Sequence, residues 1–295
     1  MSALRIGLDI GGTKTALRAV DEHGVQVHNT VVSSGEWDAE PADPAAELIL
    51  AVLSGIGVSA AEVLGLGVGA QGLDNPQVAA DLERALRARG FARVHCVNDA
   101  ALLIPAAGVD AGIGLIAGTG AIGVGTLADG TAVSAGGWGW VIGDEAGGSG
   151  IVREATRAAL LAHDDGLPDD GLLGALLTSF GVAGAERLAR AVNDEPTMAN
   201  WSPHAPAVFA AADAGSGLAA DVIDGAAAHL ARLVDQLVRR GAVGAHVVVA
   251  GSVILGQPRL AEGVRERVAA AHPGLEFHLL EDDPVAGALA LARAL

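Results

Sequence analysis

Apolar residues in the first third of the chain follow two spacings, one typical of strands and the other of amphipathic helices. Short apolar runs bounded by turn residues indicate strands, and apolar positions three to four residues apart indicate helices. The predicted strands cover 6–20 as a hairpin, 25–32, 63–68 and 92–97, and the predicted helices cover 41–53 and 76–89. This part of the chain is therefore predicted to run β-β-β-α-β-α-β.

The rest of the chain repeats this pattern at greater length. A second hairpin is expected from Ile113, with strands at 131–134, 246–250 and 275–280 and helices at about 150–163, 218–239, 259–272 and 284–295. Residues 164–217 contain several prolines and are expected to form helical insertions and loops. Within them, Trp201 to His204 is interpreted as a surface loop, with a cap over a site or a subunit contact as the alternative.

The two predicted hairpins are imperfect copies of one another. The stretch from Ile6 to Val20 recurs in altered form from Ile113 to Leu127. In both copies an apolar strand meets a tight turn rich in glycine and threonine and leaves as a second strand. Glycine lets the backbone approach a ligand closely, and Thr13, Lys14 and Thr119 add hydroxyls or a charge. Both turns are therefore predicted to bind phosphate groups, and together they suit a polyphosphate.

One difference between the copies is chemical, since Asp9 of the first corresponds to Ile116 of the second. A carboxylate beside phosphate-binding amides repels the phosphate unless a hard cation lies between them, so Asp9 is predicted to hold Mg²⁺ directly or through water. An ordinary hairpin turn is the alternative. Neither copy has the spacing of a Walker loop, and neither opens a helix as a Rossmann turn does.

Composition and charge exclude several classes of protein. Apolar residues make up 51% of the 295 residues, yet the chain has no run of about 20 uninterrupted apolar residues and no signal-type start, so we predict a cytoplasmic location and no membrane partner. The net charge of −17 argues against nucleic acid, which selects a basic surface. The single cysteine, Cys96, lies in an apolar run and is predicted to be a buried strand residue, which excludes disulfides and cysteine–zinc sites.

Asn98 and Asp99 follow the predicted strand at 92–97, where the strand passes to a helix beginning near Ala100. The carboxyl ends of strands face the ligand in α/β folds. An aspartate there can accept the proton of a hydroxyl and direct its oxygen at a phosphoryl group, which is the base that phosphoryl transfer needs. The alternative is that Asp99 caps the helix, and the two roles are compatible.

The stretch Gly136–Gly150 is too rich in glycine for a core element and is predicted to be a binding loop. It offers indole faces at Trp138 and Trp140 and carboxylates at Asp144 and Glu145, a combination that suits a sugar ring and its hydroxyls or amine. As alternatives, the indoles pack the loop, with this role favoured at least equally for Trp140, and the carboxylates cap the following helix.

Two further turns follow predicted buried strands. Residues 69–74 include Gln71, whose side chain is placed to reach the same crevice, although a plain connecting turn is the favoured interpretation. Gly251 and Ser252 end the strand at 246–250, where the backbone can pass closely over a nucleotide base or ribose.

With these motifs in place, the chain resembles, over essentially its whole length, the superfamily of acetate and sugar kinases, Hsc70 and actin. Asn98-Asp-Ala and the Gly136-Gly-Trp-Gly to Gly143-Asp-Glu motif resemble the N-acetylglucosamine kinase branch, which also includes ATPases that activate acyl-CoA reductases. Cys96 alone supplies neither the zinc-binding cysteines of ROK sugar kinases nor the cluster ligands of the reductase activators. N-acetylglucosamine kinases usually follow Gly-Thr-Gly with Ser-Asn, whereas this chain has Ala121-Ile122, and its pattern looks more like actinobacterial glucosamine kinases.

The resemblance implies a duplicated actin-like ATPase fold of the ribonuclease H type, with two domains around a nucleotide and sugar cleft that closes on the substrates. Expected domains are 1–108, joined by the helix 284–295, and 109–283 with helical insertions. It implies an ATP- and Mg²⁺-dependent kinase acting on O6 of glucosamine, with a free ammonium suited to Glu145 or Asp144, and a homodimer. N-acetylglucosamine or glucose is the alternative substrate, and a nucleotide-dependent sensor or activator is the alternative class.

The implied site residues fall into four groups. Asp99 is the catalytic base and Asp9 the metal ligand. ATP is bound by Gly11, Gly12, Thr13, Lys14, Gly118, Thr119, Gly120, Gly251 and Ser252, and the sugar by Asn98, Asp99, Gly137, Trp138, Asp144, Glu145 and Gln71.

Overall fold

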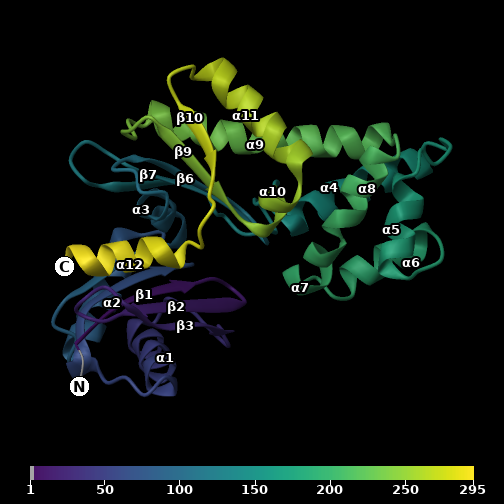
Figure 1. The fold of residues 1–295 in the computed structure, drawn as a ribbon. Coiled ribbons are helices and arrows are strands. Elements are labelled where there is room, and N and C mark those ends of the chain that lie inside the picture. The colour runs from purple at the N-terminus through teal and green to yellow at the C-terminus, as the bar shows by residue number, and fades with distance from the viewer. Residues whose placement is uncertain (1–2) are drawn as a thin grey trace. The chain divides into compact units, whose positions relative to one another are not determined.

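The computed structural model describes residues 3–295, which form two five-stranded sheets (Figure 1). The first sheet has the order β3 (Gln26–Ser33), β2 (Lys14–Val20), β1 (Leu4–Ile10), β4 (Val63–Ala70) and β5 (Val94–Asn98). β1, β2 and β3 pair antiparallel, whereas β1, β4 and β5 run parallel. The strand and helix order predicted for this part of the chain is confirmed.

The second sheet has the order β10 (Glu276–Leu279), β9 (His246–Ala250), β6 (Gly112–Ala117), β7 (Ala121–Thr126) and β8 (Ala132–Gly136). Counted from β8, its strands follow the same relative order as those of the first sheet, with the hairpin β6–β7 in the place of β1–β2. The repeat detected in the sequence is therefore a repeat of topology, and the predicted duplicated actin-like ATPase fold is confirmed.

The chain divides into two compact units. Unit 1 contains residues 1–114, 124–132 and 280–295, of which the structure describes those from residue 3, and unit 2 contains residues 115–123 and 133–279. Unit 1 is thus assembled from three separate stretches of chain, the last of which is residues 280–295.

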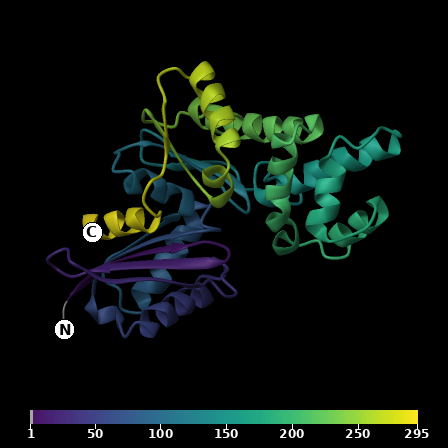
Figure 2. The ribbon, with the colours of Figure 1, turned by 45° about the vertical axis from the view of Figure 1, so that its right-hand side comes forward.

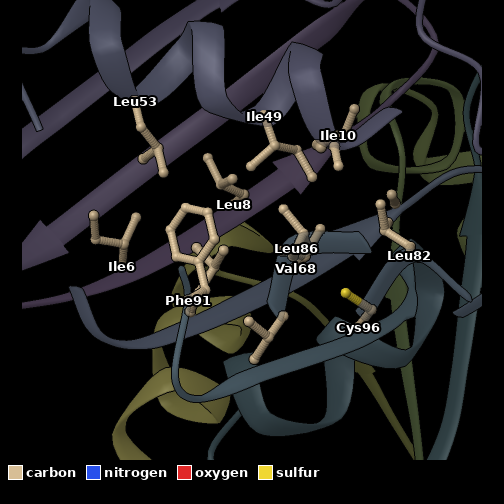
Figure 3. Packing of buried hydrophobic residues seen from close by; sticks show 14 of the residues in the cluster. Ile6, Leu8, Ile10, Ile49, Leu53, Val68, Leu82, Leu86, Phe91 and Cys96 are labelled. Carbon is tan, nitrogen blue, oxygen red and sulfur yellow. The ribbon is translucent and has the colours of Figure 1, made fainter. Parts of the chain in front are cut away.

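Unit 1 has its hydrophobic core on one face of the first sheet. There α1 (Ala42–Gly55) and α2 (Pro76–Ala88) cover β1, β4 and β5, with the short helix η1 (Ala60–Glu62) between them in sequence. Figure 3 shows strand residues such as Leu8 and Val68 packed against Ile49 of α1 and Leu86 of α2. Cys96 lies in this core as predicted, and its burial raises the pKa of the thiol.

The opposite face of the first sheet is lined by glycines. A Cβ at Gly7 would lie 2.3 Å from the backbone nitrogen of Leu289, and one at Gly67 would lie 2.1 Å from the Ala288 carbonyl oxygen. Both partners belong to α12 (Val285–Ala294), which packs along β1 and β4. The glycines therefore allow the helix backbone to lie directly on the sheet.

The turn before α12 is fastened to the sheet by an ion pair. Arg18 of β2 donates two hydrogen bonds of 3.1 Å to the two carboxylate oxygens of Asp282. The Arg18 side chain is only 15% exposed, so this bidentate pair is partly shielded from water. It holds the neighbouring Asp283 at the sheet.

Unit 2 is mostly helical outside its sheet. Its elements are α4 (Gly148–Asp164), α5 (Leu172–Phe180), α6 (Ala185–Asn193), α7 (Met198–Trp201), η3 (Ser202–His204), α8 (Ala205–Asp213), α9 (Gly217–Arg239), α10 (Ser252–Gly256) and α11 (Pro258–Ala271). In Figures 1 and 2 the segment from α5 to α8 lies beside α4 and α9, and it packs against both. The helical insertions predicted for residues 164–217 are confirmed.

The interpretation of Trp201 to His204 as a surface loop is wrong. Thr197 caps α7 by accepting a hydrogen bond of 3.1 Å from the Asn200 backbone, which starts a helix that the sequence pattern did not show. The Trp201 ring meets Trp140 edge to face with centroids 5.1 Å apart, and its Nε1 donates to the Val192 carbonyl. His204 stacks on Phe180. The segment is thus part of the packing of unit 2.

In the described residues 3–295, no single helix has both the length and the apolar character to cross a membrane, and two sharply bent helix pairs meet that test by length and composition alone.

Candidate functional site

The first glycine turn joins β1 to β2 in unit 1. The Gly11 N–H donates to the Lys14 carbonyl at 2.9 Å and closes the turn. Ser34 supports it, because its hydroxyl donates to the Gly11 carbonyl at 2.6 Å and its N–H donates to the Thr13 carbonyl at 3.2 Å. Gly12, Thr13 and Lys14 are exposed. Their backbone and side chains are therefore available to a ligand, as a phosphate-binding turn requires.

Gln71 lies directly over this turn. Its backbone N–H donates to the Ile10 carbonyl at 2.9 Å, and a Cβ built on Gly12 would lie 2.7 Å from its side-chain oxygen. Trp37 donates from its indole nitrogen to the Gln71 carbonyl at 3.0 Å. Glycine at position 12 thus leaves room for the Gln71 amide, and the structure brings these two predicted site residues together.

Asp9 and Asp99 lie at the carboxyl ends of β1 and β5. The register pairs Asp9 with Gly69 of β4 and Gly69 with Val97 of β5, and Asp99 follows two residues after Val97. Burial raises the pKa of Asp9 to about 7, with further upward contributions from the charges of Asp99 and Asp283. The charges of two further carboxyl groups therefore reach Asp9 at this edge of the sheet.

Burial also raises the pKa of Asp99, to about 6. The Ala100 N–H opposes the shift by donating to the Asp99 carboxylate at 2.9 Å, and the charge of Asp74 adds to it. Asp99 as a residue is half-buried. An aspartate with these properties is ionised at neutral pH and retains more basicity than an exposed one, which suits a general base.

The predicted capping role of Asp99 is corrected by the structure. Asn98 is the cap of the 3₁₀ helix η2 (Asp99–Leu102), since its side-chain oxygen accepts from the Ala100 N–H at 2.9 Å, and the short helix α3 (Leu103–Ala106) follows. Asn98 also donates from Nδ2 to Asp74 at 2.5 Å. The buried Asn98 amide thereby fixes the backbone that carries Asp99.

The carboxylates of unit 1 have the chemistry of a divalent cation site. Asp9 is held close enough to Asp99 and Asp283 for their charges to raise its pKa, which is unfavourable for three ionised groups in a partly buried place. A hard cation with oxygen ligands would remove that repulsion. The residues present therefore fit Mg²⁺, with Asp9 as the ligand supplied by the first hairpin.

The second glycine turn joins β6 to β7 in unit 2. The Gly118 N–H donates to the Gly120 carbonyl at 3.0 Å, so this turn closes over one residue fewer than the first. Two residues at the start of α4 support it, because the Gly148 N–H donates to the Gly118 carbonyl at 2.8 Å and the Ser149 hydroxyl donates to the Thr119 carbonyl at 3.2 Å.

Gly251 and Ser252 pack against the second turn. A Cβ on Gly251, whose φ is +111°, would lie 2.4 Å from the Ala117 carbonyl oxygen, and one on Gly118 would lie 3.7 Å from the Ser252 nitrogen. The structure thus brings together Gly118 to Gly120 with Gly251 and Ser252, as expected of residues that share a ligand. Ser252 begins the short helix α10, which the sequence analysis did not predict.

Arg153 of α4 holds the loop from Gly136 to Glu145 through hydrogen bonds to its backbone. The Arg153 guanidinium donates to the carbonyls of Trp140 and, at 3.1 Å, Gly143. Asp144 is buried and has a φ of +56°, a left-handed conformation that non-glycine residues seldom adopt. Such strain is commonly found where a side chain must be held in one direction for a ligand.

Asp144 faces the second turn, since a Cβ on Gly120 would lie 2.7 Å from its Oδ2. Burial raises the pKa of Asp144, while the Ala121 N–H and the Arg153 charge lower it and the Glu145 charge raises it. The alternative that Asp144 or Glu145 caps the next helix is wrong, because the cap of α4 is Gly147 and makes no side-chain capping bond.

Glu145 is linked to two basic residues of α9. Its Oε2 lies 3.3 Å from Nε2 of His229, and Nδ1 of His229 lies 2.8 Å from the Arg232 guanidinium. Because a guanidinium only donates hydrogen bonds, Nδ1 must accept and the proton of a neutral His229 must stand on Nε2, toward Glu145. Burial and the Arg232 charge lower the pKa of His229, against the influence of Glu145, which favours this neutral form.

The two indoles of the loop have different environments. The Trp138 side chain is 76% exposed, whereas Trp140 is half-buried and packs on Trp201. Beside Trp138, a Cβ on Gly137 would lie 2.8 Å from the Ile122 side chain, so this glycine is needed for the loop to lie close to β7. Packing therefore explains the presence of an indole at Trp140, whereas the exposed Trp138 side chain is available to contact a ligand.

Sequence reasoning missed four residues that support the site: Ser34, Arg153, His229 and Asp283. Arg153 and His229 interrupt otherwise small and apolar helix faces, which is a weak signal of a specific contact. Ser34 and Asp283 gave no signal, because their partners lie 19 and more residues away in sequence.

Two similar sheets, two glycine turns and an acidic strand end define the class of protein as an actin-like ATPase. Over residues 6–292 the sequence matches the BadF/BadG/BcrA/BcrD ATPase family, and the chain belongs to that family.

Similar proteins include several sugar kinases. An N-acetylmuramic acid/N-acetylglucosamine kinase of Clostridium acetobutylicum is 32% identical over 168 residues, which is 54% of each protein, so the alignment spans about half of that relative. A structure provisionally named an N-acetylglucosamine kinase, from Chromobacterium violaceum, is 25% identical with a TM-score of 0.76 and 99% coverage of both chains. A ROK family glucokinase from Streptomyces griseus shares the fold, with 20% identity, 99% coverage of both chains and a TM-score of 0.58.

Proposed function

We propose that this protein is an ATP- and Mg²⁺-dependent kinase that transfers the terminal phosphoryl group of ATP to O6 of an amino sugar, with glucosamine as the preferred substrate. The observation that carries the proposal is Asp99, a half-buried residue at the carboxyl end of β5 whose carboxyl group has a pKa raised by burial to about 6. It stands within electrostatic reach of Asp9 at the end of β1. A base beside a cation ligand is the arrangement that phosphoryl transfer to a hydroxyl requires.

In the proposed step, Asp99 accepts the proton of the sugar O6 hydroxyl as that oxygen attacks the terminal phosphorus of ATP. The O6–P bond forms, the bond from that phosphorus to the bridging oxygen breaks, and ADP leaves with the electron pair. Asn98 fixes the backbone of Asp99 through the cap at Ala100, so the base is oriented before the substrate arrives. Bound Mg²⁺ would neutralise charge on the phosphate oxygens.

The nucleotide is assigned to the two glycine turns. In unit 1, Gly11 to Lys14 would contact the terminal phosphates, and Asp9 would hold Mg²⁺. In unit 2, Gly118 to Gly120 would form the second phosphate contact, and Gly251 and Ser252 the contact with base or ribose. Support comes from the close packing of Gly251 against the second turn and from the exposure of Gly12, Thr13 and Lys14.

The sugar is assigned to the Gly136–Glu145 loop, with Asn98, Gln71 and Asp99 from unit 1. The proposed contacts in the loop are Gly137, Trp138, Asp144 and Glu145. Trp138 is the exposed indole that a pyranose ring would cover. The preference for glucosamine rests on the acidic pair Asp144 and Glu145, which suits a 2-ammonium group, and on Ala121-Ile122 after the second turn.

The named relatives supply competing substrates. One curated relative is a kinase of N-acetylmuramic acid and N-acetylglucosamine. These two sugars must therefore be compared as substrates with glucosamine and glucose. The family name also covers ATPases, so the alternative class is an ATPase whose turnover does not depend on a sugar. A cytoplasmic location and a homodimeric state remain predictions from the sequence.

The first experiment measures ADP release and sugar phosphate formation side by side for glucosamine, N-acetylglucosamine, N-acetylmuramic acid and glucose, with Mg²⁺ and with a chelator. We expect sugar phosphate to form fastest with glucosamine, and only when Mg²⁺ is present. Faster phosphorylation of an acetylated sugar would overturn the glucosamine preference and keep the kinase. ATP hydrolysis without any sugar product would overturn the kinase itself.

A further inference from the structure

The two outer strands of the second sheet carry a cluster of two histidines and a glutamate that has no part in the proposed kinase site. Glu276 and His278 are two residues apart on β10, so both point to the same face of the sheet. The register pairs Glu276 with His246 on β9, the neighbouring strand. Strand geometry alone therefore brings three metal-ligating side chains together.

The distances within this cluster are short and nearly equal. His246 Nδ1 lies 3.1 Å from His278 Nε2 and 3.5 Å from Glu276 Oε2, and His278 Nε2 also lies 3.5 Å from Glu276 Oε2. Three ligands placed tetrahedrally on a zinc ion at about 2.0–2.1 Å would be separated from one another by about 3.3–3.4 Å. The observed triangle thus already has the size of one face of a zinc coordination shell.

We propose that His246, Glu276 and His278 form a zinc site on the edge of the second sheet. Imidazole nitrogen and carboxylate oxygen are both common zinc ligands, and three protein ligands leave the fourth position to water. The His246 and His278 side chains are 29% and 42% exposed, so the ion can enter from solvent. This site is independent of the proposed kinase reaction and uses none of its residues.

A hydrogen bond between the two imidazoles is the competing explanation for the 3.1 Å contact. It accounts for two of the three side chains, but it does not require the Glu276 oxygen to be almost equally distant from both ring nitrogens. A metal ion accounts for all three distances. Its structural effect would be to tie the edge strand β10 to β9, since ligands from both strands share one ion.

The test titrates Zn²⁺ into chelator-treated full-length protein without an affinity tag, by isothermal calorimetry, in wild type and in His278→Gln, His246→Gln and Glu276→Gln. His23→Gln is the matched control, because His23 is an exposed histidine 3.6 Å from Glu22 and lies outside the cluster. We expect one zinc per chain in wild type and control, and affinity at least tenfold weaker in each cluster variant.

Two measurements separate this site from others. If the proposal is right, the same titration on Asp9→Asn gives the zinc affinity of wild type. If the ion instead occupies the carboxylates of unit 1, Asp9→Asn no longer binds zinc. Co²⁺ in place of Zn²⁺ should give the strong visible absorption of a tetrahedral site in wild type, and that absorption should disappear in His278→Gln while the circular dichroism spectrum is unchanged. Absence of binding at micromolar zinc, or equal affinity in wild type and the cluster variants, would overturn the proposal.

Discussion

The two glycine turns are built from the same hairpin but have opposite electrostatic surroundings. The turn after β1 lies beside Asp9, whose pKa is raised by burial and by the charges of Asp99 and Asp283. The turn after β6 follows Ile116, and its nearest carboxylate, Asp144, lies within the influence of Arg153. The first hairpin therefore lies beside carboxyl groups whose charges raise the pKa of Asp9, whereas the carboxylate beside the second turn has the Arg153 charge nearby, which opposes the effect of burial on its pKa.

This difference indicates how a duplicated element can acquire two tasks. Carboxyl groups that repel one another create a demand for a cation, which suits the reacting end of a nucleotide. Carboxyl groups with basic residues nearby, as Asp144 has Arg153 and Glu145 has His229, suit recognition of a neutral or cationic substrate. Four substitutions test this division, beginning with the largest expected effect.

Asp99→Asn should lower kcat about a thousandfold, within the range of about 10²–10⁴ that a positioned base contributes. ATP affinity should change little, and the thermal unfolding midpoint should not fall at neutral pH, because Asn can still accept the Ala100 hydrogen bond and does not bury a charge. In wild type, kcat/KM should fall as pH drops below about 6, where Asp99 becomes protonated. Asp110→Asn, at an exposed position, is the control. A rate near that of wild type would remove Asp99 from the reaction.

Asp9→Asn should lower turnover about a hundredfold and raise the Mg²⁺ concentration needed for half-maximal rate. Without divalent cations the variant should be more stable than wild type at pH 8. The pKa of Asp9 in the folded protein, about 7, lies above the ordinary 3.8, so ionisation opposes folding as pH rises through that interval.

Thermal unfolding with a chelator from pH 4 to pH 8 measures this effect. The stability difference should be near zero at pH 4, grow toward pH 7 and then level off, and Mg²⁺ should reduce it. Equal midpoints for the two proteins at pH 8 would contradict the electrostatic description of the first hairpin.

His229→Ala should raise the KM for the sugar about tenfold and change kcat less, because the Glu145 carboxylate loses the group that orients it. His229→Gln should recover much of the loss. Its amide oxygen can accept from Arg232, as Nδ1 of His229 does, and its amide nitrogen can lie toward Glu145, as Nε2 of His229 does at 3.3 Å. If Ala and Gln behave alike in KM, His229 acts only by filling space.

Trp138→Ala should raise the sugar KM about threefold and leave the unfolding midpoint unchanged, since the ring is 76% exposed. Trp140→Ala provides the comparison and should lower the midpoint, because its ring packs on Trp201. Loss of stability in Trp138→Ala without a change in KM would assign both indoles to packing.

Local patterns in the sequence were sufficient for most of the fold. The alternation of apolar runs and turn residues predicted the strands of both sheets, and the repeat between Ile6 and Ile113 predicted their shared topology. Short helices were missed where a single side chain starts them, as Thr197 does for α7. The Asn98 cap was misassigned to Asp99 because Asp99 is the first residue of the same short helix and both side chains accept from the Ala100 N–H.

The site was predictable only where one stretch of chain carries the chemistry. The turns, Asp9, Asp99 and the Gly136–Glu145 loop were visible as motifs. The contact between Glu145 and His229 was not, because sequence spacing contains no information on which helix residue will meet a distant loop.

The packing of α12 on the glycine face has a consequence for protein synthesis. Gly65 and Gly67 leave the ribosome early, whereas the helix that covers them ends at Ala294. Translation proceeds at about 5–20 residues per second, so on the order of ten seconds or longer passes before α12 has been synthesised and can cover this face of the first sheet. The nascent chain therefore carries an exposed sheet face while unit 2 is made, and premature termination before α12 would leave that face uncovered permanently.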